Sequence, residues 1–468
     1  MNRMKDTRWR RALAGMALCA GCWGVLPAQV VNPFGHALIP DMVADASIQV
    51  IDGVFYCYAT TDGYGKGLQT SGPPVVWKSE DFVHWSFDGT YFPSAEKEKY
   101  WAPSKVVPAN GRYYIYPTVN GFMYPAVADS PDGPFRLARG EDKFVLPFTP
   151  GGTLLEWKDP RAIDAEIFVD DDGQAYLYWW RRNAAKLGAD MVTVDSVVQV
   201  IPTPRTAYSE GPIFFKRNGI YYYLYTQGGG ETYQYAYVMG RQSPLGPFEV
   251  PKEDLVSTSN VAGTGVSGPG HGCVFNVPGT DDYYFAFLEY GRGSTNRQTY
   301  VNRLEFNADG TIRPVKVSMD GVGALKKVKR AERLPVDSVY ASSVCEPLFI
   351  PLKETPPGRT EYFVPEWAVD GANGSRWMAA PEDNDVWLVA DLGRVRRVRR
   401  SEVWFVRPTE GHAYELEASK DGKSWVRCGG HDEVRKLSPH TDELRGKYRY
   451  LRIRLKAGIK GVWEWHIY

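Results

Sequence analysis

A hairpin unit recurs five times over the first 330 residues of this 468-residue chain, and it limits the fold more than any other pattern in the sequence. Each copy has a polar start, a short apolar strand, a tight turn and a second strand rich in aromatic residues. Four of the five turns are Asn-Gly or Asp-Gly, which suit hairpin turns that require positive φ. The predicted first strands cover 45–50, 104–107, 164–169, 210–215 and 271–275, and their partners cover 54–59, 113–116, 175–180, 220–225 and 283–288.

The spacing of the copies indicates how many strands each one holds. The copies start at 45, 104, 164, 210 and 271, so three of the four intervals are close to 60 residues and one is 46. An interval of that length holds about four short strands, which make one blade of a β-propeller. We therefore predict an all-β fold with a five-bladed propeller. The turns alone would also allow a β-sandwich with many hairpins.

The residues that open the five first strands predict a functional site. The first strand of each propeller blade lines the central axis, so these residues should converge. Three of the starts are the acids Asp45, Asp164 and Glu210, and the others are the run 101–104 and His271. A turn cap would explain any one acid, but acids are depleted in strands and buried carboxylates cost free energy. Their equivalent placement therefore predicts chemistry. Glycoside hydrolysis uses one acid to protonate the leaving oxygen and one carboxylate to activate water, while a third acid can raise the pKa of the proton donor.

These segments resemble glycoside hydrolase family 43 over residues 31–330. The resemblance implies that Asp45 is the general base, Asp164 the pKa modulator and positioning acid, and Glu210 the general acid of an inverting hydrolase. Ala46 stands where the first motif of the family usually has proline. The matching segments are Ala44-Asp45-Ala46-Ser47-Ile48, Trp101-Ala102-Pro103, Ala162-Ile163-Asp164-Ala165, Glu210-Gly211-Pro212 and Gly268-Pro269-Gly270-His271-Gly272.

The resemblance also implies three substrate-binding residues, Trp101, His271 and Arg297. Trp101 would border the sugar pocket, His271 would lie on the axis, and Arg297 would contact the substrate. Calcium or a water molecule would then lie near His271. Calcium prefers oxygen ligands, so one histidine cannot build a site alone, and a structural, hydrogen-bonded histidine is the alternative.

The C-terminal part of the sequence has a different pattern. Residues 331–361 are rich in proline and predict a linker or a wrapping segment. Residues 362–468 resemble a discoidin-like (factor 5/8 type C) domain, which implies a jelly-roll β-sandwich that binds glycans or packs against the enzyme. Such domains often hold a structural calcium ion, for which Asp370 and Glu464 are the candidates. The basic run 394–400 is expected to form a solvated edge strand.

Composition and the N-terminus bear on localisation and partners. Lys and Arg total 55, as do Asp and Glu, so no basic excess suggests nucleic acid. Residues 1–28 read as a signal peptide, because basic residues precede an apolar stretch that is short for a membrane span; an uncleaved anchor is the alternative. No other stretch reads as transmembrane. The remaining cysteines lack metal-ligand spacing and are expected to be single buried thiols: Cys57, Cys273, Cys345 and Cys428.

Taken together, the sequence predicts an exported, periplasmic or extracellular, monomeric exo-glycosidase. It would need no cofactor for catalysis and would act on oligosaccharides or polysaccharides of plant origin. An α-L-arabinofuranosidase is the leading hypothesis, and β-xylosidase and exo-β-galactosidase are rivals within the family. A non-catalytic glycan-binding propeller is the alternative of another class, and a transferase or phosphorylase on the same fold is a third.

Overall fold

The computed structural model describes residues 32–65, 70–92, 98–140, 162–194, 199–293, 295–353 and 358–468. The chain divides into residues 1–32 and a compact unit over residues 33–468, and the following concerns the second unit. The predicted signal peptide over 1–28 lies outside the described residues. Within these ranges, no helix has the length and apolar character needed to cross a bilayer.

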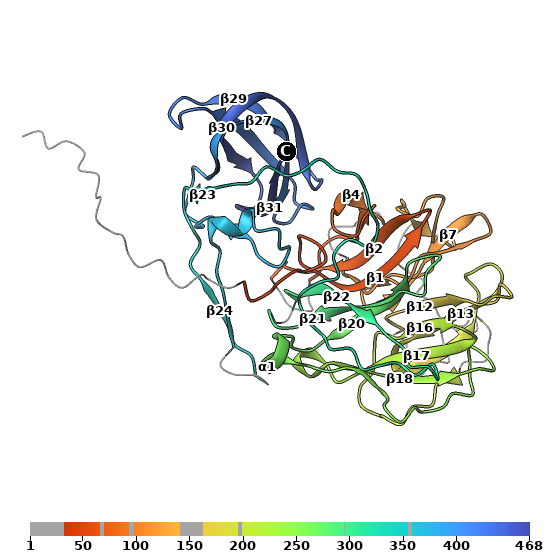
Figure 1. Cartoon of the computed structure of the whole chain (residues 1–468). Coiled ribbons are helices and arrows are strands. Elements are labelled where there is room, and N and C mark those ends of the chain that lie inside the picture. Colours follow the sequence, from red (N-terminus) through yellow and green to blue (C-terminus); the bar gives the residue numbers. More distant parts are fainter. Residues whose placement is uncertain are drawn as a thin grey trace, which may run out of the picture. The chain divides into compact units, whose positions relative to one another are not determined.

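Five antiparallel sheets follow one another along the chain (Figure 1). The first contains β1 (Val43–Ile51), β2 (Val54–Thr61), β3 (Val75–Ser79) and β4 (Ser86–Thr90). The second contains β6 (Val107–Ala109), β7 (Arg112–Ile115), β10 (Ala126–Ala128) and β11 (Arg136–Leu137). The third contains β12 (Glu166–Val169), β13 (Ala175–Trp179), β14 (Asn183–Lys186) and β15 (Gln199–Val200). The fourth contains β16 (Ile213–Arg217), β17 (Ile220–Gln227), β18 (Gln234–Gly240) and β19 (Leu255–Ser257). The fifth contains β20 (Gly270–Asn276), β21 (Tyr283–Glu289) and β22 (Gln298–Leu304).

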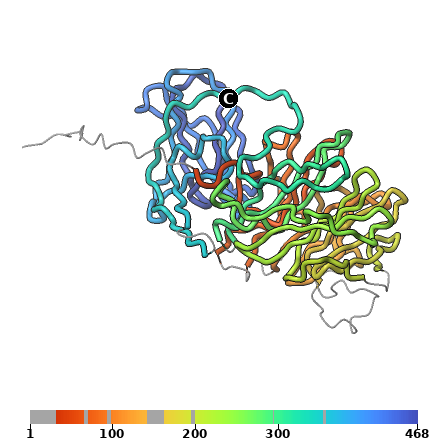
Figure 2. The backbone as a smooth tube through the Cα atoms, turned by 60° about the horizontal axis from the view of Figure 1, so that its bottom comes forward, coloured from red at the N-terminus to blue at the C-terminus, as the bar shows by residue number. Residues whose placement is uncertain are grey.

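Five hydrophobic clusters join these sheets in a cycle. One cluster lies between each pair of successive sheets, and a further cluster joins the fifth sheet to the first. Strand β17 shows why the second strands are so aromatic. Successive side chains point to opposite faces of a sheet, so Tyr221 and Tyr223 pack toward the third sheet while Tyr222 and Leu224 pack toward the fifth. Both faces are therefore buried. In the tube view of Figure 2, the yellow and green segments lie together, and the blue C-terminal segments gather in a separate group.

Several details of the predicted repeat are wrong. The first strands of the second, third and fourth copies begin at Val107, Glu166 and Ile213 rather than at residues 104, 164 and 210. In the second copy, the residues expected to open the first strand make other contacts. The Ser104 hydroxyl accepts a hydrogen bond from the Tyr116 N–H at 2.8 Å, and Trp101 belongs to a separate small sheet. That sheet contains β5 (Tyr100–Trp101), β8 (Thr118–Val119) and β9 (Phe122–Met123). The fifth sheet has three strands where four were expected.

The C-terminal part forms a seven-stranded sheet over a hydrophobic core of its own. The path runs through β26 (Trp377–Met378), β31 (Gly461–Ile467), β27 (Trp387–Phe405), β30 (His440–Ala457), β28 (His412–Ser419) and β29 (Val426–Arg435), with β23 (Ser338–Ala341) pairing β27. The basic run is solvated as predicted, with Arg397 and Arg399 exposed. Strand β27 as a whole lies between β31 and β30, but β23 pairs only with Leu388–Asp391 and β31 only with Ser401–Phe405. Among the described strands, Arg396–Val398 therefore pairs with β30 alone, as an edge does.

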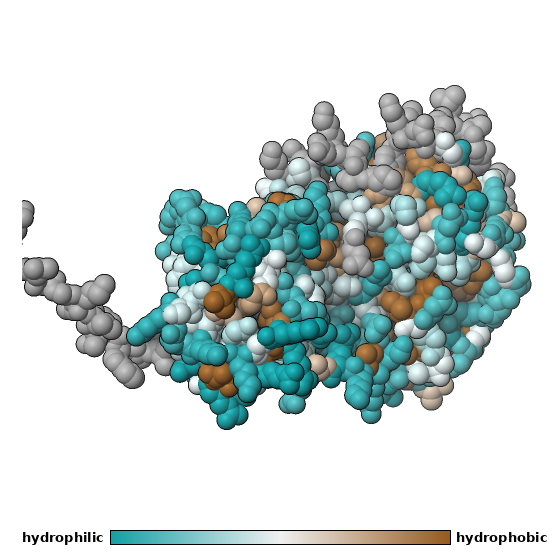
Figure 3. Space-filling model, turned by 90° about the horizontal axis from the view of Figure 1, so that it is seen from above, coloured by the Kyte–Doolittle hydropathy of each residue, from teal (hydrophilic) through white to brown (hydrophobic). Residues whose placement is uncertain are grey.

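The segment that precedes this sheet carries short elements of its own. It contributes β23 and a hairpin of β24 (Leu348–Ile350) and β25 (Arg359–Glu361). The remaining elements are the single-turn helices η3 (Trp180–Arg182), η4 (Gly230–Thr232), α1 (Val261–Thr264) and η5 (Pro365–Ala368). The face drawn in Figure 3 is mostly hydrophilic with scattered hydrophobic residues.

The C-terminal sheet packs directly on the first sheet of the cycle. Trp404 and Trp463 belong to the cluster that joins the first and fifth sheets, and the Trp404 Nε1–H donates to the Trp85 carbonyl at 2.9 Å. Phe87 and Ser438 exchange two backbone hydrogen bonds of 2.6 and 2.9 Å. Trp463 is therefore a core residue of this contact rather than an exposed sugar platform. The four cysteines of the described residues are free thiols. Cys57 and Cys273 are buried as expected, whereas Cys345 and Cys428 are only half-buried.

Candidate active site

One cavity of about 460 Å³ gathers the three predicted acids and the three predicted substrate-binding residues. Asp45 comes from the first sheet, Asp164 precedes the third, and Glu210 precedes the fourth. The cavity is lined by Asp45, Trp101, Ala102, Thr118, Gly121, Ile163, Asp164, Tyr208, Glu210, Gly230, Tyr233, His271, Tyr290 and Arg297. The structure thus brings together residues that are as far as 252 positions apart in the sequence.

Left-handed backbone conformations place several of these residues. The φ angles of Asp45, Ala102 and Asp164 are 51°, 34° and 60°, and that of Gly211, next to the third acid, is 54°. Such angles are uncommon for residues other than glycine and cost about 1–3 kcal/mol each. The ladder between β1 and β2 is also irregular between Ala44 and Ser47, on either side of Asp45. A left-handed backbone conformation therefore recurs at or next to each of the three acids, close to where its sheet begins.

Asp45 is held by an arginine that also binds a second aspartate. The Arg297 Nη1 and Nη2 groups donate to Asp45 Oδ1 and Oδ2 at 3.2 and 3.3 Å. The Arg297 Nε and Nη2 groups donate to Asp62 Oδ2 and Oδ1 at 2.8 and 3.1 Å. All three side chains are buried. Burial opposes the charge on Arg297, but the carboxylates of Asp45 and Asp62 raise its pKa well above the ordinary value. Sequence reasoning missed Asp62, because it follows a second strand and has no counterpart in the repeat.

Asp164 is buried and protonated more readily than a free aspartate. Burial raises its pKa well above the ordinary value, and the charges of Glu210 and Asp45 act in the same direction. The Gly211 N–H donates to Asp164 Oδ2 at 3.3 Å and partly opposes this effect. The Thr118 hydroxyl accepts from the Asp164 N–H at 3.0 Å and fixes the backbone. These surroundings suit an acid that adjusts the charge of its neighbours.

Two tyrosines hold the carboxyl group of Glu210. Tyr208 donates its hydroxyl hydrogen bond to Oε2 at 2.7 Å, and Tyr233 donates to Oε1. Burial and then the charge of Glu210 raise the pKa of both phenols, that of Tyr233 well above its ordinary value, so both remain protonated donors. The Glu210 N–H is fixed by the Thr226 hydroxyl at 2.8 Å. Neither tyrosine was predicted, because tyrosines are so common in this sequence that no pattern distinguishes these two.

His271 lies between two of the acids. Its Nδ1 is 3.6 Å from Asp45 Oδ1 and 3.8 Å from Asp164 Oδ2. Burial lowers the pKa of His271, which favours the neutral imidazole. Trp101 and Arg297 lie near each other, with the guanidinium carbon 5.9 Å from the centre of the indole ring. In the described ranges, no three or more His, Cys, Asp or Glu side chains are grouped so as to hold a metal ion.

The candidate calcium ligands of the C-terminal domain lie next to each other. Burial raises the pKa of Asp370 to about 7, with a further contribution from the charge of Glu464. Burial likewise raises the pKa of Glu464 to about 7. Asp370 accepts hydrogen bonds from the Ala372 N–H and the Ser375 hydroxyl, whereas Glu464 Oε1 is buried with no hydrogen-bond partner among the described residues. An exposed and a buried carboxyl group lying side by side, one with an unsatisfied oxygen, offer part of the oxygen ligand set that a calcium ion needs.

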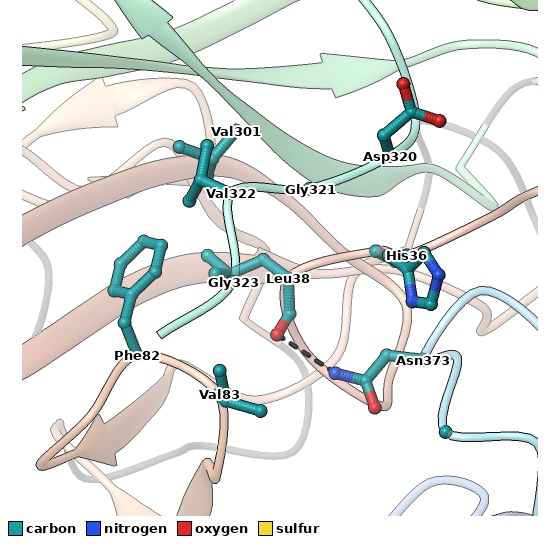
Figure 4. A pocket seen from close by; sticks show the side chains of 12 residues that line it. His36, Leu38, Phe82, Val83, Val301, Asp320, Gly321, Val322, Gly323 and Asn373 are labelled. Atoms are coloured by element: carbon teal, nitrogen blue, oxygen red, sulfur yellow. Dashed lines mark hydrogen bonds between the residues drawn. The ribbon is translucent and has the colours of Figure 1, made fainter. Parts of the chain in front are cut away.

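A second cavity, of about 250 Å³, lies away from the acids (Figure 4). Its walls are mostly apolar and include Leu38, Phe82, Val301 and Val322. The hydrogen bond drawn across it runs from Asn373 Nδ2 to the Leu38 carbonyl at 3.1 Å. Asp320 is the only acid among its lining residues, so it lacks the pair of carboxyl groups that the acid-lined cavity has.

Comparison with protein families identifies both parts of the chain. The family model described as "Glycosyl hydrolases family 43" matches residues 34–312. This chain belongs to glycosyl hydrolase family 43. The family 43 chain also carries a segment, residues 351–467, that matches the "F5/8 type C domain". The predicted glycoside hydrolase activity and the discoidin-like C-terminal domain are thereby confirmed.

Relatives of this family 43 enzyme have several substrates in their names. The "Beta-D-galactofuranosidase xynD" of Aspergillus niger is 30% identical over 312 residues, which are 62% of this chain and 86% of that protein. An "Arabinoxylan arabinofuranohydrolase" of Paenibacillus polymyxa is 26% identical over 350 residues, covering 63% of this chain and 53% of that protein. The chain thus spans about half the length of the second relative. A solved structure of a "Glycoside hydrolase" is 70% identical, with a TM-score of 0.90, and covers 94% of this chain and 100% of that chain.

Proposed function

We propose that this family 43 enzyme is an inverting exo-glycosidase on a five-bladed β-propeller, with Glu210 as general acid, Asp45 as general base and Asp164 as pKa modulator. The observation that carries the proposal is the convergence of these three acids on one cavity. A non-catalytic glycan-binding propeller would not need to hold three acids together against the cost of their burial.

The surroundings of each acid support its proposed role. Asp45 receives two hydrogen bonds from Arg297, which fix the orientation of its carboxylate. In the proposed mechanism this carboxylate activates a water molecule on one face of the sugar. Glu210 then protonates the leaving oxygen on the opposite face. Asp164 lies close enough for its charge state and that of Glu210 to influence each other. Inversion requires the base and the acid to act on opposite faces of one ring.

The size and lining of the cavity suit a sugar substrate. A volume of about 460 Å³ has room for a terminal sugar and part of the next unit, and pockets that bury most of a ligand are typically of this order. Trp101, Tyr208 and Tyr290 offer aromatic surface to the apolar side of a sugar ring.

We propose α-L-arabinofuranose as the terminal sugar, since an arabinofuranohydrolase is among the relatives. The second candidate is β-D-galactofuranose, which the name of the 30% identical relative favours. The two furanosides have the same ring configuration and differ in one exocyclic hydroxymethyl group. A pocket discriminates against such a group by about 10–200-fold when it contacts apolar walls, so both substrates should be assayed side by side, with a β-xyloside as comparison.

A leaving-group test examines the roles of the acids. Losing a general acid costs about 10²–10⁴-fold when the leaving group needs a proton. We expect Glu210→Gln to lose that factor on an alkyl arabinofuranoside but far less on a dinitrophenyl arabinofuranoside, whose leaving group departs unprotonated. Asp45→Asn should impair both substrates alike. Equal losses in Glu210→Gln would contradict the assignment. Glycan binding by a wild-type enzyme that hydrolyses nothing would favour the binding-module alternative, and stimulation by phosphate or acceptor sugars would favour a phosphorylase or transferase.

Two further proposals concern the ends of the chain. We propose that Asp370 and Glu464 hold a structural calcium ion, which would neutralise two adjacent carboxyl groups whose pKa values are both raised to about 7. We also propose that residues 1–28 direct export, in keeping with a substrate outside the cell. Fractionation of the cells and sequencing of the N-terminus would test this proposal. An enzyme outside the cytoplasm that begins after residue 28 would support it, and an enzyme in the cytoplasm with residues 1–28 intact would contradict it.

A further inference from the structure

The buried carboxyl group of Asp62 suggests a role that goes beyond the three acids, and this inference rests on the proposed function. We propose that Asp62 is a positioning residue that holds Arg297 in place against the general base Asp45. The three side chains Asp62, Arg297 and Asp45, linked by hydrogen bonds, are called the relay below. Asp62 does not reach the sugar pocket itself, because its side chain is fully buried and it is not among the lining residues.

The hydrogen bonds show an arginine clamped along two edges. The Nε–Nη2 edge of Arg297 binds both oxygens of Asp62, and the Nη1–Nη2 edge binds both oxygens of Asp45. Asp62 also accepts the backbone N–H of Arg297 at 2.8 Å, which ties the carboxyl group to the main chain of the loop. Bidentate pairs of this kind fix orientation as well as adding energy.

The backbone around Asp62 is rigid, which makes it a suitable anchor. It directly follows the β1–β2 ladder, whose last pair is Val43 and Thr61. Its N–H donates to the Met42 carbonyl at 2.9 Å. The anchor therefore belongs to the same sheet as Asp45, while Arg297 arrives from a segment 235 residues later. The relay connects the two segments across the cycle of sheets.

Charge explains why a second carboxylate is needed. Asp45 paired with Arg297 alone would be a neutral ion pair, which is a weak acceptor for a proton from water. With Asp62 present, two carboxylates share one guanidinium, and the relay keeps one net negative charge at the base. A guanidinium has five N–H groups, and four are used here, so one Nη1–H remains. Four of the five N–H groups of Arg297 thus bind carboxylates, and only one remains for the substrate contact that the sequence predicted.

The test measures kcat and KM of purified full-length enzyme on the best aryl glycoside. We expect Asp62→Asn to lower kcat by about 10–100-fold, the loss that follows a small misplacement of a reacting group, with KM within threefold of wild type. Asp41→Asn is the matched control. Asp41 is another buried aspartate of the same region, its pKa is raised to about 7 by burial, and it does not bind Arg297. This control should retain wild-type kcat.

A double-mutant cycle separates positioning from loss of structure. If Asp62 acts through Arg297, the Asp62→Asn/Arg297→Lys double variant should be no more than threefold slower than Arg297→Lys alone. The relay would be overturned if the fold loss in kcat of the double variant equalled the product of the losses of the two single variants. A folded Asp62→Asn variant with wild-type kcat would overturn it as well. If Asp62→Asn fails to fold, Asp62→Glu takes its place, with the same expectations. A wild-type enzyme inactive on all glycosides overturns the proposed function as well, whereas an active wild type with an active Asp62→Asn overturns the relay alone.

Discussion

Substituting Glu361 by glutamine should destabilise the contact between the C-terminal part and the fifth sheet of the cycle. Glu361 Oε1 lies 3.1 Å from Arg292 Nη2 and 3.2 Å from Arg376 Nη1, and all three side chains are at most 8% exposed. Burial lowers the pKa of Arg376 to about 10, the charge of Arg292 adds to this effect, and Glu361 opposes it. Without that carboxylate, two buried guanidinium groups face each other.

The expected loss can be worked out from these distances. At an effective dielectric constant of about 20, a unit charge pair at 3.1 Å attracts by about 5 kcal/mol, and much of that offsets desolvation. Removing one partner of a buried pair costs about 3–5 kcal/mol. Glutamine keeps the volume and one acceptor, so we expect about 3 kcal/mol. Arg292 also donates to Gln298, the neighbour of Arg297, so kcat should fall too.

Urea unfolding followed by the fluorescence of the 15 tryptophans measures this loss. Glu366→Gln is the matched control, because Glu366 is exposed in η5 and forms no ion pair in the described part of the chain. Its effect should stay within about 0.5 kcal/mol. A Glu361→Gln enzyme within 1 kcal/mol of wild type would refute the reasoning, since it would show that the two guanidinium groups do not depend on this carboxylate.

Three further predictions concern other parts of the molecule. Tyr233→Phe removes a hydrogen bond to Glu210 and should lower kcat by about tenfold, which corresponds to the roughly 1.4 kcal/mol of a hydrogen bond to a charged group. The control Tyr225→Phe leaves the pocket untouched and should keep the wild-type kcat. Equal kinetics for both variants would show that Tyr233 does not orient the acid. Millimolar Ca²⁺ should raise the melting temperature of the wild type but not that of Glu464→Gln, and an identical shift in both enzymes would exclude these ligands. Burial lowers the pKa of His412 to about 4. The neutral imidazole therefore contributes stability that is complete above the unfolded-state pKa of about 6.5, and roughly 3 kcal/mol of it is lost as the pH falls to 4. His412→Phe should lose less stability than the wild type between pH 7 and 4, and parallel curves of unfolding free energy against pH would contradict this.

The repeat could be predicted from the sequence because its signals are local. Asp-Gly and Asn-Gly turns fix the hairpins, and the second strands β2, β7, β13, β17 and β21 lie within two residues of their expected ends. The first strands of the second and fourth copies start three residues later than predicted, because the residues before them are held by local contacts: Ser104 bonds the Tyr116 backbone, and the Glu210 N–H donates to the Thr226 hydroxyl. The basic run 394–400 was predictable as a solvated edge because its charges are exposed, but the sequence did not show that β23 and β31 pair with β27 on either side of it.

The site was predictable only where it follows the repeat. Asp45, Asp164 and Glu210 occupy equivalent positions, so one geometric argument places all three. Asp62 and Tyr233 come from segments outside the repeated unit, and their partners lie 235 and 23 residues away in the sequence. Contacts of this kind depend on how the sheets pack, which no local pattern encodes.

The anomeric form of the first sugar released tests the central claim most directly. Proton NMR of a concentrated enzyme sample during the first turnovers of an α-L-arabinofuranoside, or of the β-D-galactofuranoside if that is the substrate, distinguishes the two anomers before they interconvert. Three acids arranged as base, modulator and proton donor predict that the product of opposite configuration appears first. A product that retains the configuration of the substrate would require one of these carboxylates to act as a nucleophile and would contradict the account.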